Sequence, residues 1–137
     1  MSDPRVAALD HAIARWNAGD WTAATEGADP GIEWVTPPED PDTATYRGAE
    51  GIRAYWAQWA EALEDVRMEV EEYVPAGERL VVTLRRSGRG RASGAHVEDR
   101  LFLVYSFRGE RVSRVQEFRE REQALSAAGR GRELDFS

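Results

Sequence analysis

The chain has 137 residues, a length typical of a single domain, and a formal net charge of −7. It has no cysteine and its 18 basic residues are all arginine, which excludes disulfides, thiolate sites and lysine Schiff bases. The acidic balance disfavours binding to nucleic acid, and no basic leader or long apolar run indicates secretion or a membrane span. We therefore expect a cytoplasmic protein whose partners include neither nucleic acid nor membrane.

The charge is unevenly distributed along the chain. Residues 1–84 carry 6 arginines and 17 acidic residues, whereas residues 85–137 carry 12 arginines and 8 acidic residues. One interpretation is that outward arginines on sheet strands face a helical layer with outward acidic residues. The other interpretation is an arginine-assisted anion site, and the sequence leaves both open.

Three helices are predicted in the N-terminal half. The first runs from about Pro4 to Ala18, where apolar residues recur at helical spacing: Val6, Leu9, Ile13 and Trp16. Gly19 ends this helix, and a short second helix is predicted over residues 20–27. The strongest periodicity in the chain predicts a third helix with three aromatic residues on one stripe: Ile52, Tyr55, Trp56, Trp59, Ala60 and Leu63.

Short apolar runs predict the strands. The first strand covers residues 31–36 and ends at a proline-rich loop. From Asp65 onward the period changes to two, which predicts four antiparallel strands joined by short turns. A short helix over residues 120–129 and a loose tail over residues 130–137 follow. Residues 1–129 are thus predicted to form one α+β domain, with helices on one face of a curved antiparallel sheet.

Four passages resemble a known fold family: residues 17–20 (Asn-Ala-Gly-Asp), 33–37 (Glu-Trp-Val-Thr-Pro), 46–52 (Tyr-Arg-Gly-Ala-Glu-Gly-Ile) and 107–112 (Phe-Arg-Gly-Glu-Arg-Val). Their order and spacing are similar to the nuclear transport factor 2-like superfamily, and the ending over residues 119–129 resembles that of SnoaL-like proteins. The superfamily includes SnoaL-like polyketide cyclases, ketosteroid isomerases and limonene epoxide hydrolases. The resemblance implies a cone-shaped, cystatin-like fold, a pocket for a small and largely apolar organic molecule, and a homodimer through the sheet.

The catalytic groups of the ketosteroid isomerases are missing at the matching positions. Ala12 stands where that family has its tyrosine donor, the general base falls near Val35 or Thr36, and the protonated acid falls near Leu103. The Asp-Arg-Asp relay of the limonene epoxide hydrolases also lacks a clear second aspartate. The cyclase mechanism needs only one carboxyl group with a raised pKa in an apolar pocket, and several acidic residues could serve.

Strand alternation indicates which charged side chains face the pocket. If Leu103 faces inward, Asp99 shares its face, and Glu117 on the last strand opposes it. The same argument places Arg85 inward on the strand over residues 80–86. Arg85 and Glu117 are therefore expected on one concave surface, either as a static ion pair or as an acid/base site in which Glu117 or Asp99 titrates and Arg85 is the electrostatic partner.

His96 begins a predicted strand beside a stretch rich in glycine, serine and arginine. It is either a general base at the pocket mouth or a half-exposed residue at a strand end. No group of His, Asp and Glu has the spacing of metal ligands, and Ser93 does not lie in a G-x-S-x-G turn. We therefore expect neither a metal nor a cofactor.

Five tryptophans in so small a chain favour a flat, apolar ligand that stacks on rings, although aromatic stripes more often form plain core. The expected lining residues of the pocket are Trp16, Trp34, Trp56, Trp59, Thr83, Leu103, Tyr105 and Val115. Two classes of function remain open. One is a cofactor-independent cyclase or isomerase that acts by acid/base proton transfer, and the other is a non-catalytic carrier, sensor or dimerisation module.

Overall fold

The elements of the computed structural model follow the predicted order over residues 3–129, the part of the chain that the structure describes. The predicted tail over residues 130–137 lies outside these residues. The helices are α1 (Pro4–Asn17), α2 (Trp21–Thr25), α3 (Gly48–Ala62) and α4 (Arg121–Ala127). The strands are β1 (Ala28–Val35), β2 (Thr45–Arg47), β3 (Leu63–Ala76), β4 (Arg79–Gly90), β5 (His96–Arg108) and β6 (Arg111–Phe118). The fold is therefore α+β.

Polar side chains fix both ends of α1. The Asp3 carboxylate accepts a hydrogen bond from the Arg5 backbone N–H at 2.9 Å, and Pro4 follows as the first helical residue. At the other end, the Asn17 side chain bonds both backbone groups of Met68 on β3. Its Nδ2 donates to the Met68 carbonyl at 2.8 Å, and its Oδ1 accepts from the Met68 N–H at 2.9 Å. These bonds attach the end of α1 to the sheet.

The strands form one six-stranded sheet in the order β2-β1-β6-β5-β4-β3. Every neighbouring pair is antiparallel except β1 and β6, which are parallel, with Trp34 opposite Val115. The prediction had treated the sheet as antiparallel and had missed β2, because a strand of three residues is too short to show alternation. The first long strand is thus placed beside the last.

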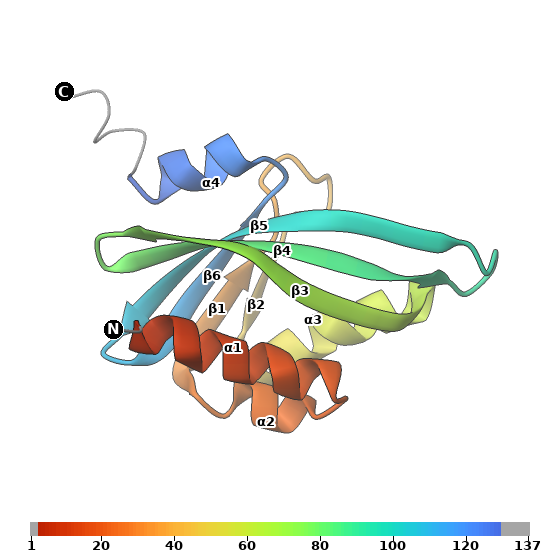
Figure 1. Ribbon diagram of the computed structural model, residues 1–137, viewed down its shortest axis with the longest axis horizontal. Coiled ribbons are helices and arrows are strands. Elements are labelled where there is room, and N and C mark those ends of the chain that lie inside the picture. Colours follow the sequence, from red (N-terminus) through yellow and green to blue (C-terminus); the bar gives the residue numbers. More distant parts are fainter. Residues whose placement is uncertain (1–2, 130–137) are drawn as a thin grey trace.

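Helices α1, α2 and α3 cover the concave face of the sheet, while α4 lies on the opposite, outer face (Figure 1). The larger core lies under the three helices and includes four tryptophans. A smaller core lies under α4, where Val81, Val104 and Phe118 pack against Ala124. No helix within residues 3–129 is both long enough and apolar enough to cross a bilayer.

The predicted alternation on β4 was wrong by one residue. Val82 lies opposite Leu103, which lies opposite Glu117, so these side chains share the concave face. Arg85 therefore points to the outer face. The reason is that residues 80–84 are all buried, since α4 covers part of the outer face. A strand that is buried on both faces has a continuous apolar run and shows no alternation.

Candidate functional site

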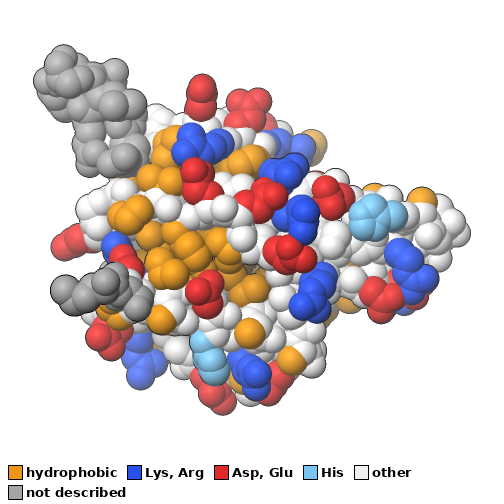
Figure 2. Space-filling model, viewed as in Figure 1, with side chains coloured by type: hydrophobic (Ala, Val, Ile, Leu, Met, Phe, Trp, Pro, Cys, Tyr) orange, Lys and Arg blue, Asp and Glu red, His pale blue; other side chains and the backbone are white. Residues whose placement is uncertain are grey.

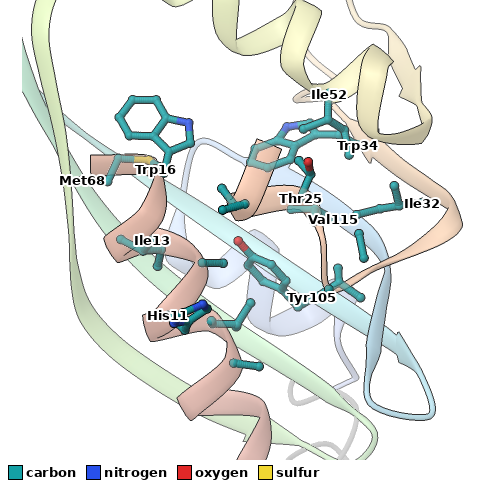
Figure 3. Close-up of a pocket in the computed structure, with 18 of the residues that line it drawn as sticks. His11, Ile13, Trp16, Thr25, Ile32, Trp34, Ile52, Met68, Tyr105 and Val115 are labelled. Atoms are coloured by element: carbon teal, nitrogen blue, oxygen red, sulfur yellow. The ribbon is translucent and has the colours of Figure 1, made fainter. Parts of the chain in front are cut away.

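An apolar cavity of about 200 Å³ lies between the concave face of the sheet and helices α1, α2 and α3. Side chains from the three helices and from every strand except β2 form its wall. Figure 3 shows these side chains converging on one space from α1 and the sheet. The structure places five of the eight predicted lining residues in this wall: Trp16, Trp34, Trp56, Tyr105 and Val115.

The cavity reaches solvent between α1 and the turn that joins β5 to β6. The exposed members of its lining come from these segments and from the connection between α2 and β1: Ala8, His11, Gly27 and Glu110. His11 is exposed and lies on the side of α1 that borders the cavity (Figure 3). The only ionisable groups other than Tyr105 among the described lining residues, His11 and Glu110, therefore stand at the exposed rim.

Tryptophan rings meet at right angles in the cavity wall. The Trp56 ring contacts the Trp16 and Trp34 rings edge to face, with centroids 6.1 and 6.3 Å apart. Trp59, which the sequence had placed in the lining, packs against Trp16 and Trp34 but does not reach the cavity. Trp21, which was not predicted, stacks on Trp16 at 5.8 Å. Such contacts hold the rings in defined positions, so the wall is preformed.

The polar groups in the cavity wall differ in whether they have hydrogen-bond partners within the protein. The Thr25 hydroxyl contacts the backbone carbonyls of Trp21 and Thr22 and the Arg53 guanidinium within 3.1 Å. No hydrogen bond joins the Tyr105 hydroxyl to another group in residues 3–129, and burial raises the pKa of this phenol. The indole N–H groups of Trp16 and Trp56 are fully buried without a partner in the described chain. The described wall therefore contains two fully buried hydrogen-bond donors that no protein group meets.

Glu117 is buried on the concave face, as strand alternation predicted, with 7% of its surface exposed. Its Oε1 accepts hydrogen bonds from Trp34 Nε1 at 3.0 Å and from the Tyr55 hydroxyl at 2.8 Å. Burial, followed by the nearby charge of Glu117, raises the pKa of Tyr55, so this phenol remains a donor. We call these three residues the Glu117 cluster. Glu117 itself is not part of the cavity lining, because the hydrogen bond holds it beside the indole of Trp34.

The predicted pairing of Arg85 with Glu117 is wrong. Arg85 lies on the outer face, where its guanidinium bonds Glu69 at 2.6 Å. The arginine on the concave side is its neighbour Arg86, whose guanidinium lies 4.7 Å from the centroid of the Trp59 ring. Arg86 also makes two hydrogen bonds, of 3.0 and 2.5 Å, to the Asp99 carboxylate. Asp99 is therefore held in an ion pair outside the cavity lining.

Comparison with known proteins identifies the family. The SnoaL-like domain matches residues 9–115. The chain belongs to the SnoaL-like family. Similar solved structures include an NTF2-like protein of unknown function from Burkholderia pseudomallei, with 15% identity over 91% of this chain and 97% of that one and a TM-score of 0.75. TerC, co-crystallized with polyporic acid, has 20% identity over 92% and 98% of the two chains and a TM-score of 0.74.

A third neighbour of the SnoaL-like chain comes from Catenulispora acidiphila and has a ketosteroid isomerase-like fold in complex with trimethylamine. It is 17% identical over 89% of this chain and 92% of that chain, with a TM-score of 0.70. No curated protein matches the sequence. At these identities the likeness establishes the NTF2-like fold alone, so the function must be argued from the site.

The other predicted site residues of this SnoaL-like chain lie away from the cavity wall. The His96 side chain is 69% exposed at the start of β5, with its Nε2 3.9 Å from Glu98. Thr83 is buried on the outer side of β4, and Leu103 is fully buried in the packed core. Within residues 3–129 no group of three or more His, Asp and Glu is arranged to hold a metal ion.

Several cavity residues were missed as lining residues because they are ordinary aliphatic side chains. Ile13 and Ile52 lie on the helical stripes that the sequence shows, and Met68 lies on the alternating run of β3. These patterns mark each side chain as inward. They do not distinguish residues that border a cavity from residues that pack against one another, because that depends on how well the helices fill the concave face.

Proposed function

We propose that this SnoaL-like chain binds a small, largely apolar organic molecule in the cavity between the helices and the sheet. The observation that carries the proposal is an apolar space of about 200 Å³ walled by the rings of Trp16, Trp34 and Trp56. An apolar cavity holds water poorly, so a ligand that fills it gains dispersion contacts and leaves water itself. The binding of polyporic acid by TerC and of trimethylamine by the Catenulispora protein supports small-molecule binding in this fold.

The positions of the acidic residues favour a carrier or sensor over an acid/base enzyme. General acid/base catalysis needs a carboxyl group within hydrogen-bond reach of the substrate. Glu117 is bonded to Trp34 and Tyr55, and Asp99 is paired with Arg86. Glu110, the one carboxylate among the described lining residues, stands at the exposed rim of the cavity. In this arrangement a ligand in the cavity contacts no internal acid.

Acid/base catalysis by Glu117 is the second candidate function. Its support is that Trp34 both lines the cavity and donates to Glu117 Oε1, so the carboxylate lies directly behind a residue of the cavity wall. A substrate that displaced this indole would meet a buried carboxylate beside the Tyr55 phenol. A cyclase or isomerase of this kind would need no metal and no cofactor.

The outer face gives less support to a dimerisation module. Ion pairs within the chain lie on this face over β3, β4 and β5, among them Arg85–Glu69 and Arg100–Glu71. Figure 2 shows basic and acidic side chains interleaved beside a patch of hydrophobic ones. Interface cores are usually depleted of charged residues. The homodimer through the sheet that the resemblance implies stays a prediction, which sedimentation equilibrium tests directly.

The proposed function is tested by titrating the protein with tetralin, a bicyclic hydrocarbon, and following tryptophan fluorescence. We expect saturable quenching, because the ligand would contact rings of the cavity wall. The variant Ala12→Leu places three further carbon atoms of α1 in the cavity and should abolish quenching. The matched control, Ala7→Leu, makes the same change at an exposed position of the same helix and should leave binding intact.

Two outcomes would overturn the proposal. Quenching that persists unchanged in Ala12→Leu would place the probe outside the cavity. Loss of quenching in both leucine variants, with the fold preserved by circular dichroism, would mean that the effect reports on α1 rather than on the cavity. Loss in Ala12→Leu alone, with unfolding cooperativity equal to that of Ala7→Leu, supports a ligand in the cavity.

A further inference from the structure

The first half of β5 has a free backbone edge. β6 pairs with β5 only from Phe102 onward, so no strand of residues 3–129 covers that edge of residues 96–101. Figure 1 shows the hairpin of β4 and β5 extending beyond β6 and β1. Residues 96–100 are exposed on both faces of the strand. This edge is therefore open to a further strand.

The pairing of β5 with β4 indicates which backbone groups point to the open edge. The Gly90 N–H donates to the Ala95 carbonyl at 2.9 Å, and the ladder continues from there without a shift in register. Hydrogen-bonded and non-bonded pairs alternate along an antiparallel ladder, so the odd-numbered residues of this stretch bond β4. The N–H and C=O groups of the even-numbered residues, Glu98 and Arg100 among them, therefore point to the open edge.

The outer edges of the sheet are protected in ways that the open edge of β5 is not. β2 is only three residues long. β3 contains Pro75 and two shifts in its register with β4, and both backbone groups of Met68 are bonded to the Asn17 side chain. Short strands, bulges and prolines prevent pairing between edges. Residues 96–101 have a regular register and no proline, so only their charged side chains restrict what can pair with them.

These charges are complementary to a second copy of the same edge. Two copies related by a two-fold axis pair antiparallel, and the residues that point to the edge must lie opposite one another. With the axis at Asp99, Glu98 of each copy lies opposite Arg100 of the other, and two cross-strand ion pairs form. The two neighbouring registers place like charges opposite each other, Glu98 on Glu98 or Arg100 on Arg100. The charges therefore favour the register centred on Asp99.

The remaining side chains suit the same register. Val97 is the only large hydrophobic side chain of residues 3–129 that is exposed, at 43%, and this register places it opposite Leu101. Asp99 of each copy faces its symmetry mate at the axis, but its carboxylate is already paired with Arg86 in its own chain. The pairing thus covers the exposed valine, and an ion pair within each chain offsets the one contact between like charges.

We propose that two copies of this chain associate edge to edge through residues 96–101 of β5, in the antiparallel register centred on Asp99. The two six-stranded sheets then form one continuous sheet. The contact uses the edge of the sheet and not its outer face, so it differs from the homodimer that the family resemblance implies. It does not depend on a ligand in the cavity. A contact this short is small, so the dimer is weak and its population depends on protein concentration.

Charge reversal tests the register, because two variants that fail to pair alone should pair with each other. In Glu98→Arg both opposed positions carry arginine, and in Arg100→Glu both carry glutamate. We expect each variant to weaken the dimer by about tenfold in sedimentation equilibrium. An equimolar mixture should restore it, because every arginine then lies opposite a glutamate. The matched control, Glu78→Arg, makes the same change of charge in the exposed turn between β3 and β4 and should leave the dimer intact.

Amide hydrogen exchange, followed by NMR, separates this pairing from a contact through the outer face. On dimerisation the amides of Glu98 and Arg100 should become protected, whereas those of Val97 and Asp99, which already bond β4, should change little. A wild type that stays monomeric at millimolar concentration would leave the edge to a partner other than a second copy and would overturn the proposal. A dimer that both reversals leave intact, or a mixture of the two variants that stays monomeric, would overturn it as well.

Discussion

Two groups of polar side chains lie on the concave face and differ in whether their donors and acceptors have hydrogen-bond partners. In the Glu117 cluster, one carboxylate oxygen accepts from both Trp34 and Tyr55. In the cavity wall, the Tyr105 hydroxyl and the Trp16 indole have no partner within the described residues. A closed hydrogen-bond network stabilises the fold, whereas open donors add no stability until something binds them. The Glu117 cluster is therefore expected to contribute to stability, whereas the open donors of the wall are available to a bound ligand.

Removal of the acceptor at the centre of the Glu117 cluster should destabilise the protein more than any other substitution considered below. Glu117→Ala leaves the Trp34 N–H and the Tyr55 hydroxyl without their partner. We expect the free energy of unfolding, measured by urea denaturation, to fall by about 2–3 kcal/mol. Glu117→Gln is the matched control, because its amide oxygen can still accept, and it should lose about 1 kcal/mol or less.

A stabilised Glu117→Ala variant would contradict the stabilising role of the Glu117 cluster. Groups kept for catalysis commonly reduce stability, so their removal raises it. That outcome would favour the acid/base enzyme over the carrier, with Glu117 as its functional carboxylate.

The same substitution, Tyr to Phe, can be made in the Glu117 cluster and in the cavity wall. Tyr55→Phe removes a donor to a buried carboxylate and should lower the free energy of unfolding by about 1.5 kcal/mol. Tyr105→Phe removes a hydroxyl that has no partner, so stability should stay within about 0.5 kcal/mol of the wild type or rise. A large loss of stability in Tyr105→Phe without ligand would show that its hydroxyl is already bonded.

Small changes in stability are expected on β4, where the neighbouring residues Arg86 and Arg85 lie on opposite faces of the sheet. Arg86→Ala removes a guanidinium that stacks on Trp59 and pairs with Asp99, and we expect a loss of about 1 kcal/mol in thermal or urea unfolding. Arg85→Ala removes an exposed pair with Glu69 and should change stability by no more than about 0.3 kcal/mol. The reverse order would mean that the alternation predicted from the sequence, with Arg85 inward, is correct after all.

The helices could be predicted from the sequence because each buries a single stripe. The spacing of Leu9 and Trp16 on α1, and of Ile52, Trp56 and Trp59 on α3, matches the residues found buried. On β4 the same method failed, because both faces of residues 80–84 are buried and the apolar pattern has no period. Periodicity therefore identifies an element that is solvated on one side. It cannot assign the faces of a strand that is buried on both sides.

The site could be predicted only in part for a related reason. Strand alternation on β6 correctly made Glu117 an inward residue. Its partners, Trp34 and Tyr55, come from β1 and α3, and which of them reaches the carboxylate depends on packing between distant segments. The sequence therefore supplied an arginine as the expected partner of a buried acid, whereas the structure supplies an indole and a phenol. Only the spatial arrangement shows that Tyr105 lacks such a partner.

The parallel pairing of β1 with β6 has a consequence for the synthesis of the chain. Trp34 lies beside Val115, so β1 gains that neighbour only after nearly all of the domain has left the ribosome. Until then the aromatic segments of α1, β1 and α3 stay exposed, since contacts between distant segments form late. We expect this domain to complete its fold only after β6 has emerged, with its tryptophans open to chaperones in the meantime.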